Sequence, residues 1–145
     1  MIDCTIAVAE RLRTHAGESF ASVGLLASFA ALDGLPRTTP AAYVLPLRID
    51  AEDNSVITGV TQTLTLTFGV LLLARHAGDA SGAKATEQLE ALRSAAAAAL
   101  VAWTPEGCLE PIQFAGGEIV QADAGLVVWR DDFVVTRLAS FDTQT

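Results

Sequence analysis

One stretch of the sequence, TQTLTLTFGVLLLA at residues 61–74, restricts the possible folds more than any other. Its apolar residues alternate with threonines as far as Phe68, and after Gly69 the stretch is apolar throughout. Alternation with a period of two predicts a β-strand that lies with one face on a core. That face consists of the even-numbered residues Leu64, Leu66, Phe68, Val70 and Leu72.

The opposite face of this strand changes character along its length. Its first half is an uncharged row of hydroxyl side chains from Thr61, Thr63, Thr65 and Thr67. Beyond Gly69 the same face continues with Leu71 and Leu73, which need a cover, and we expect the long helix of the chain to provide it. For the threonine row two interpretations stay open: it faces solvent, or it contacts another subunit.

The length of the strand adds a second constraint. About 14 residues at roughly 3.3 Å each span about 46 Å. A compact domain of 145 residues has a diameter of only roughly 38 Å. The strand must therefore bend at Gly69 or project from the domain. A projecting strand without charges is suited to pairing with another subunit, because nothing on it repels an incoming strand edge.

Length and composition indicate one globular domain that covers residues 1–145. Hydrophobic residues make up 51% of the chain, which is enough for a sizeable core. The chain has 17 acidic and 9 basic residues, and its net charge of -8 opposes tight binding to nucleic acid phosphates. Such a surface would still let DNA slide past without sticking.

Cysteine usage and the N-terminus indicate a protein made in a cytosol. Cys4 and Cys108 show no zinc or disulfide spacing, so we expect both to be reduced and at least partly buried. Residues 1–13 include Asp3 and lack the basic start and apolar segment of a signal peptide. The apolar stretch AAAAALVAW is too short to span a bilayer, and no membrane partner is expected.

Hydrophobic periodicity predicts an α+β fold, a single domain in which two main helices pack against a mostly antiparallel sheet. Pro46 implies a sheet edge or a bulge. We expect helices at residues 3–15, 27–32 and 81–102, strands at 19–26, 40–47, 61–74, 109–115, 118–122 and 126–138, and a loop at 48–60.

Two features of the C-terminal third concern strand connections. Gly116 and Gly117 predict a tight hairpin, and a second turn is expected at residues 123–125. Arg130, Asp131 and Asp132 interrupt the last apolar run, which indicates a bulge or an exposed edge protected by charge. Neighbouring strand residues point to opposite faces, so the two aspartates are not expected to act as an acid/base pair.

The motifs of common enzyme classes are absent from the sequence. His15 ends the first helix, where a cation is favourable, and His76 is expected in a turn. Asp50, Glu52 and Asp53 lack the order of a calcium loop and predict a solvated acidic loop. We therefore expect no catalytic, cofactor-binding or metal-binding residues, and no cofactor.

Several short segments, taken in order, resemble one known family. They are TPAAYVLPL at 39–47, Gln62 with FGV at 68–70, LEALRSA at 89–95, AWTP at 102–105, FAGG at 114–117 and WRDDF at 129–133. Their order and spacing from about residue 38 to residue 136 resemble the tail terminator, or tail completion, proteins of tailed bacteriophages and related prophage or gene-transfer particles.

The resemblance implies a structural protein of the virion and no catalysis. Members of that family form a homo-hexameric ring on the head-proximal end of the tail tube, stop its polymerisation and contact the neck or head-tail connector. Partners would be further copies of the chain, the tube protein and neck proteins, with DNA only passing through the lumen after assembly in the host cytoplasm. From strand geometry and charge, we expect the subunit or tube interface among Thr61, Thr63, Thr65, Thr67, Asp50, Glu52, Asp53, Arg130, Asp131 and Asp132.

Two other functions remain open from the sequence. A neck or head-completion ring protein of the same type of particle would have the same composition. A small enzyme or ligand-binding protein with a pocket between subunits, around Trp103 and Trp129, is the alternative from a different class.

Overall fold

The centre of the protein is one five-stranded sheet with the strand order β1-β2-β3-β5-β4. The computed structural model describes residues 3–28, 31, 38–76, 83–123 and 125–141. The strands are β1 (Ser22–Leu25), β2 (Ala41–Ala51), β3 (Val60–Arg75), β4 (Gln113–Asp123) and β5 (Leu126–Phe141). Only β1 and β2 pair in parallel, and the other neighbours are antiparallel. The predicted α+β class with a mostly antiparallel sheet is confirmed.

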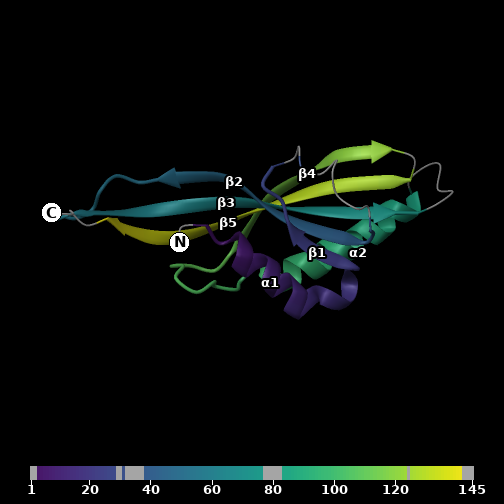
Figure 1. The fold of residues 1–145 in the computed structure, drawn as a ribbon, viewed down its shortest axis with the longest axis horizontal. Coiled ribbons are helices and arrows are strands. Elements are labelled where there is room, and N and C mark those ends of the chain that lie inside the picture. The colour runs from purple at the N-terminus through teal and green to yellow at the C-terminus, as the bar shows by residue number, and fades with distance from the viewer. Residues whose placement is uncertain (1–2, 29–30, 32–37, 77–82, 124, 142–145) are drawn as a thin grey trace.

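Two α-helices lie on the same face of the sheet, α1 (Thr5–Ala16) and α2 (Ala83–Leu100), and a short 3₁₀ helix η1 (Gly17–Ser19) follows α1 (Figure 1). Helix α2 packs on β3 and β5, and α1 packs beside it on β1 and β2. The even-numbered face of β3 lies on the core, as predicted. Phe68 of β3 stacks on Phe133 of β5 with 5.6 Å between ring centroids. This face holds the larger of two apolar clusters.

Leu71 and Leu73 belong to the second cluster, on the opposite face of the sheet. Both are buried, together with Tyr43 of β2 and Val128 of β5. The prediction that the long helix covers them is wrong. Successive residues of a strand point to opposite faces, and α2 covers only the face formed by even-numbered side chains such as Val70. Leu71 and Leu73 therefore face away from the helix.

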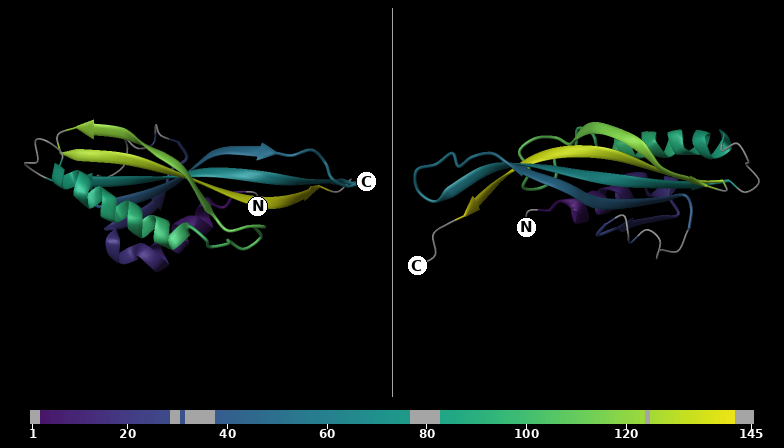
Figure 2. Two further views of the ribbon diagram at one scale, coloured as in Figure 1. Left: turned by 180° about the vertical axis from the view of Figure 1, so that it is seen from behind. Right: turned by 90° about the horizontal axis from the view of Figure 1, so that it is seen from above.

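The strands β2, β3 and β5 continue well beyond the helices and form a projecting arm (Figures 1 and 2). Of the two expected alternatives, a bend at Gly69 or a projection from the domain, the structure has the projection. The expectation that its edge is open to another subunit is wrong, because β3 is paired on both sides. Thr65, for example, lies between Asp50 of β2 and Thr136 of β5. Edge pairing is left only to the outer strands β2 and β5, and a partner must contact one of these, a face or the tip of the arm.

Strand β2 is longer than predicted, so the expected loop at residues 48–60 shrinks to residues 52–59. Residues 48–51 pair with residues 64–67 of β3. The predicted bulge at Pro46 is confirmed by a register shift between Pro46 and Arg48. Half of the short helix expected at residues 27–32, namely residues 29, 30 and 32, falls outside the described residues.

The hairpin predicted at Gly116 and Gly117 is wrong, because both residues lie inside the continuous strand β4. Gly116 has a φ of 132° beside a register shift that forms a bulge. A Cβ on Gly117 would lie 2.8 Å from the indole nitrogen of Trp129 and would also collide with the Asp131 carboxylate. The glycine pair therefore allows a close approach rather than a turn. The turn expected at residues 123–125 does join β4 to β5 around Gly125, which has a φ of 80°.

Candidate interaction surface

The arm consists of residues 48–51 of β2, the connection 52–59, residues 60–67 of β3 and residues 134–141 of β5. The predicted threonine row lies on its face opposite the helices, where all four threonines are partly exposed. On β5 this face continues with Thr136 opposite Thr65 and Leu138 opposite Thr63. Near the tip, the hydroxyls of Thr61 and Ser140 lie 3.1 Å apart. We call this surface the threonine face.

The connection at the tip of the arm is held in shape by Asn54. Its side-chain nitrogen donates to the carbonyls of Val56 and Gly59, at 3.0 and 3.2 Å. Its side-chain oxygen accepts from the backbone nitrogen of Thr61 at 2.9 Å. This ordered loop presents Ile57 at its end, where the side chain is fully exposed, with a relative accessibility of 105%.

On the threonine face and at the tip, the charged side chains are one ion pair and two acidic residues, whereas Arg137 of β5 lies opposite Leu64 on the other face. Arg48 donates from Nε to both carboxylate oxygens of Asp50 at 2.8 Å, so the two charges on the threonine face cancel. Glu52 and Asp53 are exposed beside the tip. Among the described residues, no three His, Cys, Asp or Glu side chains are placed to hold a metal ion.

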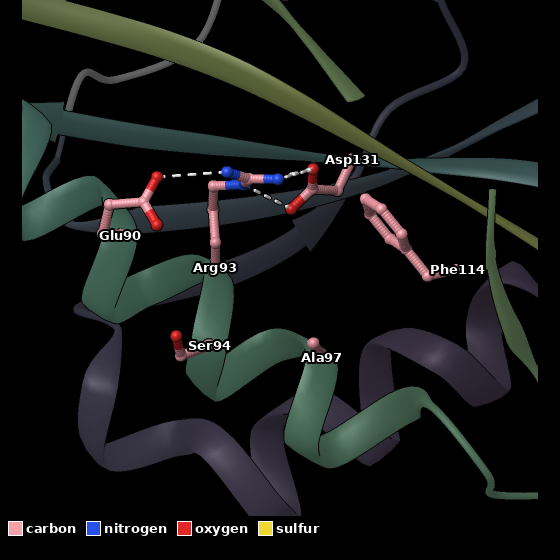
Figure 3. A pocket seen from close by; sticks show the side chains of 6 residues that line it. All are labelled: Glu90, Arg93, Ser94, Ala97, Phe114 and Asp131. Carbon is pink, nitrogen blue, oxygen red and sulfur yellow. Dashed lines mark hydrogen bonds and ion pairs between the residues drawn. The ribbon is translucent and has the colours of Figure 1, made fainter. Parts of the chain in front are cut away.

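A groove of about 250 Å³ lies between α2 and strands β4 and β5 (Figure 3). Helix α2 packs mainly on β3 and β5, and this leaves the helix-facing side of β4 incompletely covered. Phe114 on β4 is half-exposed there and meets Phe133 edge to face. The lining side chains are Glu90, Arg93, Ser94, Ala97, Phe114 and Asp131.

The polar wall of the groove is a nearly buried ion pair. The Asp131 carboxylate is 3% exposed and accepts from Nε of Arg93 at 3.0 Å. It also accepts from the indole nitrogen of Trp129 at 2.8 Å, and the Arg93 guanidinium lies 4.6 Å from the centre of that ring. The hydrogen bond to Asp131 raises the pKa of Arg93 above its usual value. This arrangement fixes α2 to β5.

Arg130 and Asp132 lie on the other face of β5. Arg130 donates to Asp132 at 2.7 Å and reaches Glu118 on β4 at 3.2 Å. The expected opposite directions of Asp131 and Asp132 are confirmed. The expectation of a charged exposed edge is wrong, because β5 lies between β3 and β4, and the bulge is in the neighbouring strand β4. Asp131 is a buried structural group.

The structure does not bring the two tryptophans into one pocket. Trp103 lines a separate hollow beside α1, where the guanidinium of Arg11 lies 4.9 Å from its ring centre. In the same hollow, Nε2 of His15 lies 2.7 Å from Nη1 of Arg11.

His76 is paired with the turn after β4, since its backbone nitrogen donates to the carbonyl of Gly125 at 3.0 Å.

Both cysteines are free thiols, Cys4 buried and Cys108 partly buried. Burial, with smaller contributions from the nearby Cys108 and Asp3, raises the pKa of the Cys4 thiol to about 12. Burial also raises the pKa of Cys108. Both thiols are therefore protonated near neutral pH.

We expect Cys4 to resist alkylation in the folded protein. With a thiol pKa of about 12, about one molecule in a few thousand carries the thiolate at pH 8.5. Because the pKa is raised, the thiolate fraction and the alkylation rate should increase as the pH rises toward 12. Peptide mass spectrometry after iodoacetamide treatment, with and without urea, measures this; rapid labelling of Cys4 without urea would contradict it.

Sequence reasoning missed Ile57 and the groove. Ile57 had a signal, since Val56 and Ile57 are two branched aliphatic residues in a connection that is otherwise polar apart from Gly59. Arg93 and Asp131 are 38 residues apart, and no local pattern links them.

Of the expected interface residues, the threonines and Asp50 share one face of the arm, whereas the triplet at residues 130–132 lies elsewhere on the sheet.

The described residues thus form one α+β domain with two surface features outside its core, the projecting arm and the groove between α2 and β4. The model of the phage tail terminator protein family matches residues 2–140, and the chain belongs to that family. The family is one of structural phage proteins, which is the class expected from the sequence.

A solved structure supports the fold. A chain of the structure described as the virion of a native gene transfer agent particle is 18% identical, with a TM-score of 0.57, and the match covers 91% of this chain and 92% of that chain. None of the curated proteins matches the sequence. Within the described residues, neither helix combines the length and apolar character needed to cross a membrane.

Proposed function

We propose that six copies of this chain form a ring on the head-proximal end of a phage tail tube. There the ring stops polymerisation of the tube and provides the joint to the neck or connector. The tube protein, the neck proteins and the other copies of the chain are its partners in the virion. The ring has no catalytic task.

The arm is the observation that carries this proposal. It extends beyond the helices (Figure 2). Its threonine face carries no net charge that would repel a copy of the same chain, because Arg48 is paired with Asp50. Two molecules of net charge -8 repel each other, so contact between copies is favoured where charges cancel. A contact between two different surfaces of one chain closes into a ring when the rotation between copies allows it.

The acidic composition suits a ring through which the genome passes. A lumen wall of the same sign as the DNA phosphates would not hold the passing duplex. We place Glu52 and Asp53, the exposed acidic residues beside the tip, toward that lumen or its rim. The proposal assigns DNA no binding site on this chain.

Inactivation of the gene in the parent phage or prophage should give overlong tail tubes without heads. Without the ring, tube subunits continue to add after the correct length is reached, and the neck has no surface to join. Electron microscopy of tail lengths and head attachment measures the effect, and the intact gene supplied in trans is the control. Tubes of normal, uniform length without heads would assign the chain to the neck, and intact particles would remove it from virion assembly.

A further inference from the structure

We infer that the arm tip of one copy inserts Ile57 into the groove between α2 and β4 of the next copy. This inference rests on the proposed ring and specifies its subunit contact. The donor is the loop ordered by Asn54, and the acceptor is the groove lined by Phe114 and Ala97.

The exposed side chain of Ile57 would be stabilised by contact with another apolar surface. The side chain is fully exposed at the end of a loop that Asn54 holds by hydrogen bonds to the backbone. Val56 beside it is 40% exposed, and Phe141 at the end of β5 is 49% exposed. An apolar group held in water on an ordered loop gains free energy when a partner covers it, and little conformational entropy is lost because the loop is already fixed.

The groove has the size and the lining to accept such a side chain. Its volume is about 250 Å³, which exceeds that of one branched aliphatic side chain. Phe114 and Ala97 supply apolar contacts on two sides (Figure 3). The charged groups in its wall are already paired with one another, because Arg93 forms ion pairs with Asp131 and with Glu90. Insertion of an apolar side chain therefore leaves these ion pairs intact.

The tip cannot reach the groove of its own chain. Asp131 in the groove pairs with Val70, and β3 runs from the tip at Val60 to that residue. This part of the strand spans about 33 Å at roughly 3.3 Å per residue. A tip that fills this groove must therefore come from another molecule. When two copies are joined in this way, one still has a free tip and the other a free groove, so further copies can add until the ring closes.

The area of the arm supports a contact that includes the tip. Strands β3 and β5, about 4.8 Å apart, run for about 26 Å over residues 60–67, and β2 accompanies them for only about 13 Å, so the threonine face measures about 310 Å². A stable interface needs about 800 Å² from each partner. The threonine face alone is therefore too small, and the tip must contribute. The pairing of Arg48 with Asp50 keeps this face free of net charge toward a second acidic copy.

Cross-linking between single-cysteine additions tests the contact. Ile57→Cys and Ala97→Cys proteins are mixed and treated with a short bis-maleimide. We expect a cross-linked heterodimer as the main product of the mixture and no dimer from either variant alone. Ala91→Cys, at an exposed position of α2 outside the groove, replaces Ala97→Cys as the matched control and should give little product. The parent protein measures the background from Cys4 and Cys108.

Four results would overturn the inference. A dimer of Ile57→Cys with itself would indicate contact between two tips. Equal products from the Ala91→Cys and Ala97→Cys mixtures would remove the groove as the site. No heterodimer in a preparation that sediments as a ring would exclude this contact and leave the proposed ring intact. A parent chain that stays monomeric, with and without tail tubes, would instead overturn both the ring and the contact.

Discussion

Replacement of Thr63 and Thr65 by lysine should abolish ring formation without unfolding the subunit. Both threonines lie on the threonine face, and both are only partly buried, so the folded chain keeps the new ammonium groups in water. In the ring, the added charges would be enclosed against a neighbouring copy, where unpaired charges cost several kcal/mol. Asp50, the nearest anion across β2, is already paired with Arg48 and does not neutralise both lysines.

Sedimentation velocity and tail-length measurements check this expectation. The fraction of protein in rings should fall below detection, whereas the free energy of unfolding should change by about 1 kcal/mol or less. The matched control is Thr63→Val with Thr65→Val, which keeps the side-chain shape and adds no charge. A lysine double variant that forms rings as readily as the parent would show that the threonine face is not part of the interface.

Replacement of Arg93 by methionine should lower the free energy of unfolding by about 3 kcal/mol, because it leaves a buried carboxylate without its cation. Asp131 is 3% exposed and would keep only the hydrogen bond from Trp129. Methionine retains much of the side-chain volume, so the effect reports on the charge and its hydrogen bonds. Urea unfolding, monitored by tryptophan fluorescence, measures the change.

Arg130→Met is the matched control for this prediction. It removes an arginine from the same region, but the two anions left behind, Asp132 at 22% exposed and Glu118 at 65% exposed, stay accessible to water. We expect a loss of about 1 kcal/mol or less there. Equal losses for the two variants would mean that the burial of Asp131 does not determine the stability of the link between α2 and β5.

The sequence predicted the fold best where periodicity is local. The spacing of apolar residues within each segment predicted both helices, the long strand and the face of that strand that lies on the core. The errors concern features that depend on distant parts of the chain. The glycine pair at 116–117 predicts a turn when taken alone, but in the fold Trp129 and Asp131 occupy the space that a Cβ would need.

In the candidate site, too, features set by local patterns could be predicted from the sequence, and features set by distant contacts could not. The threonine row could be recognised from sequence because alternation places its members on one face. The buried role of Asp131 could not be recognised, because its partner Arg93 lies 38 residues away on a helix. The groove also depends on how α2 crosses the sheet, and this crossing leaves part of β4 uncovered.

An acidic α+β chain with one strand too long for its domain could be recognised from the amino-acid sequence alone, and several segments, in their order along the chain, resembled the tail terminator family to which it belongs. The position of this strand inside a three-stranded arm, with Ile57 at the tip, became apparent only from the folded chain. Hydrophobic periodicity specifies which face of an element is buried, whereas strand order and helix placement depend on contacts between distant residues.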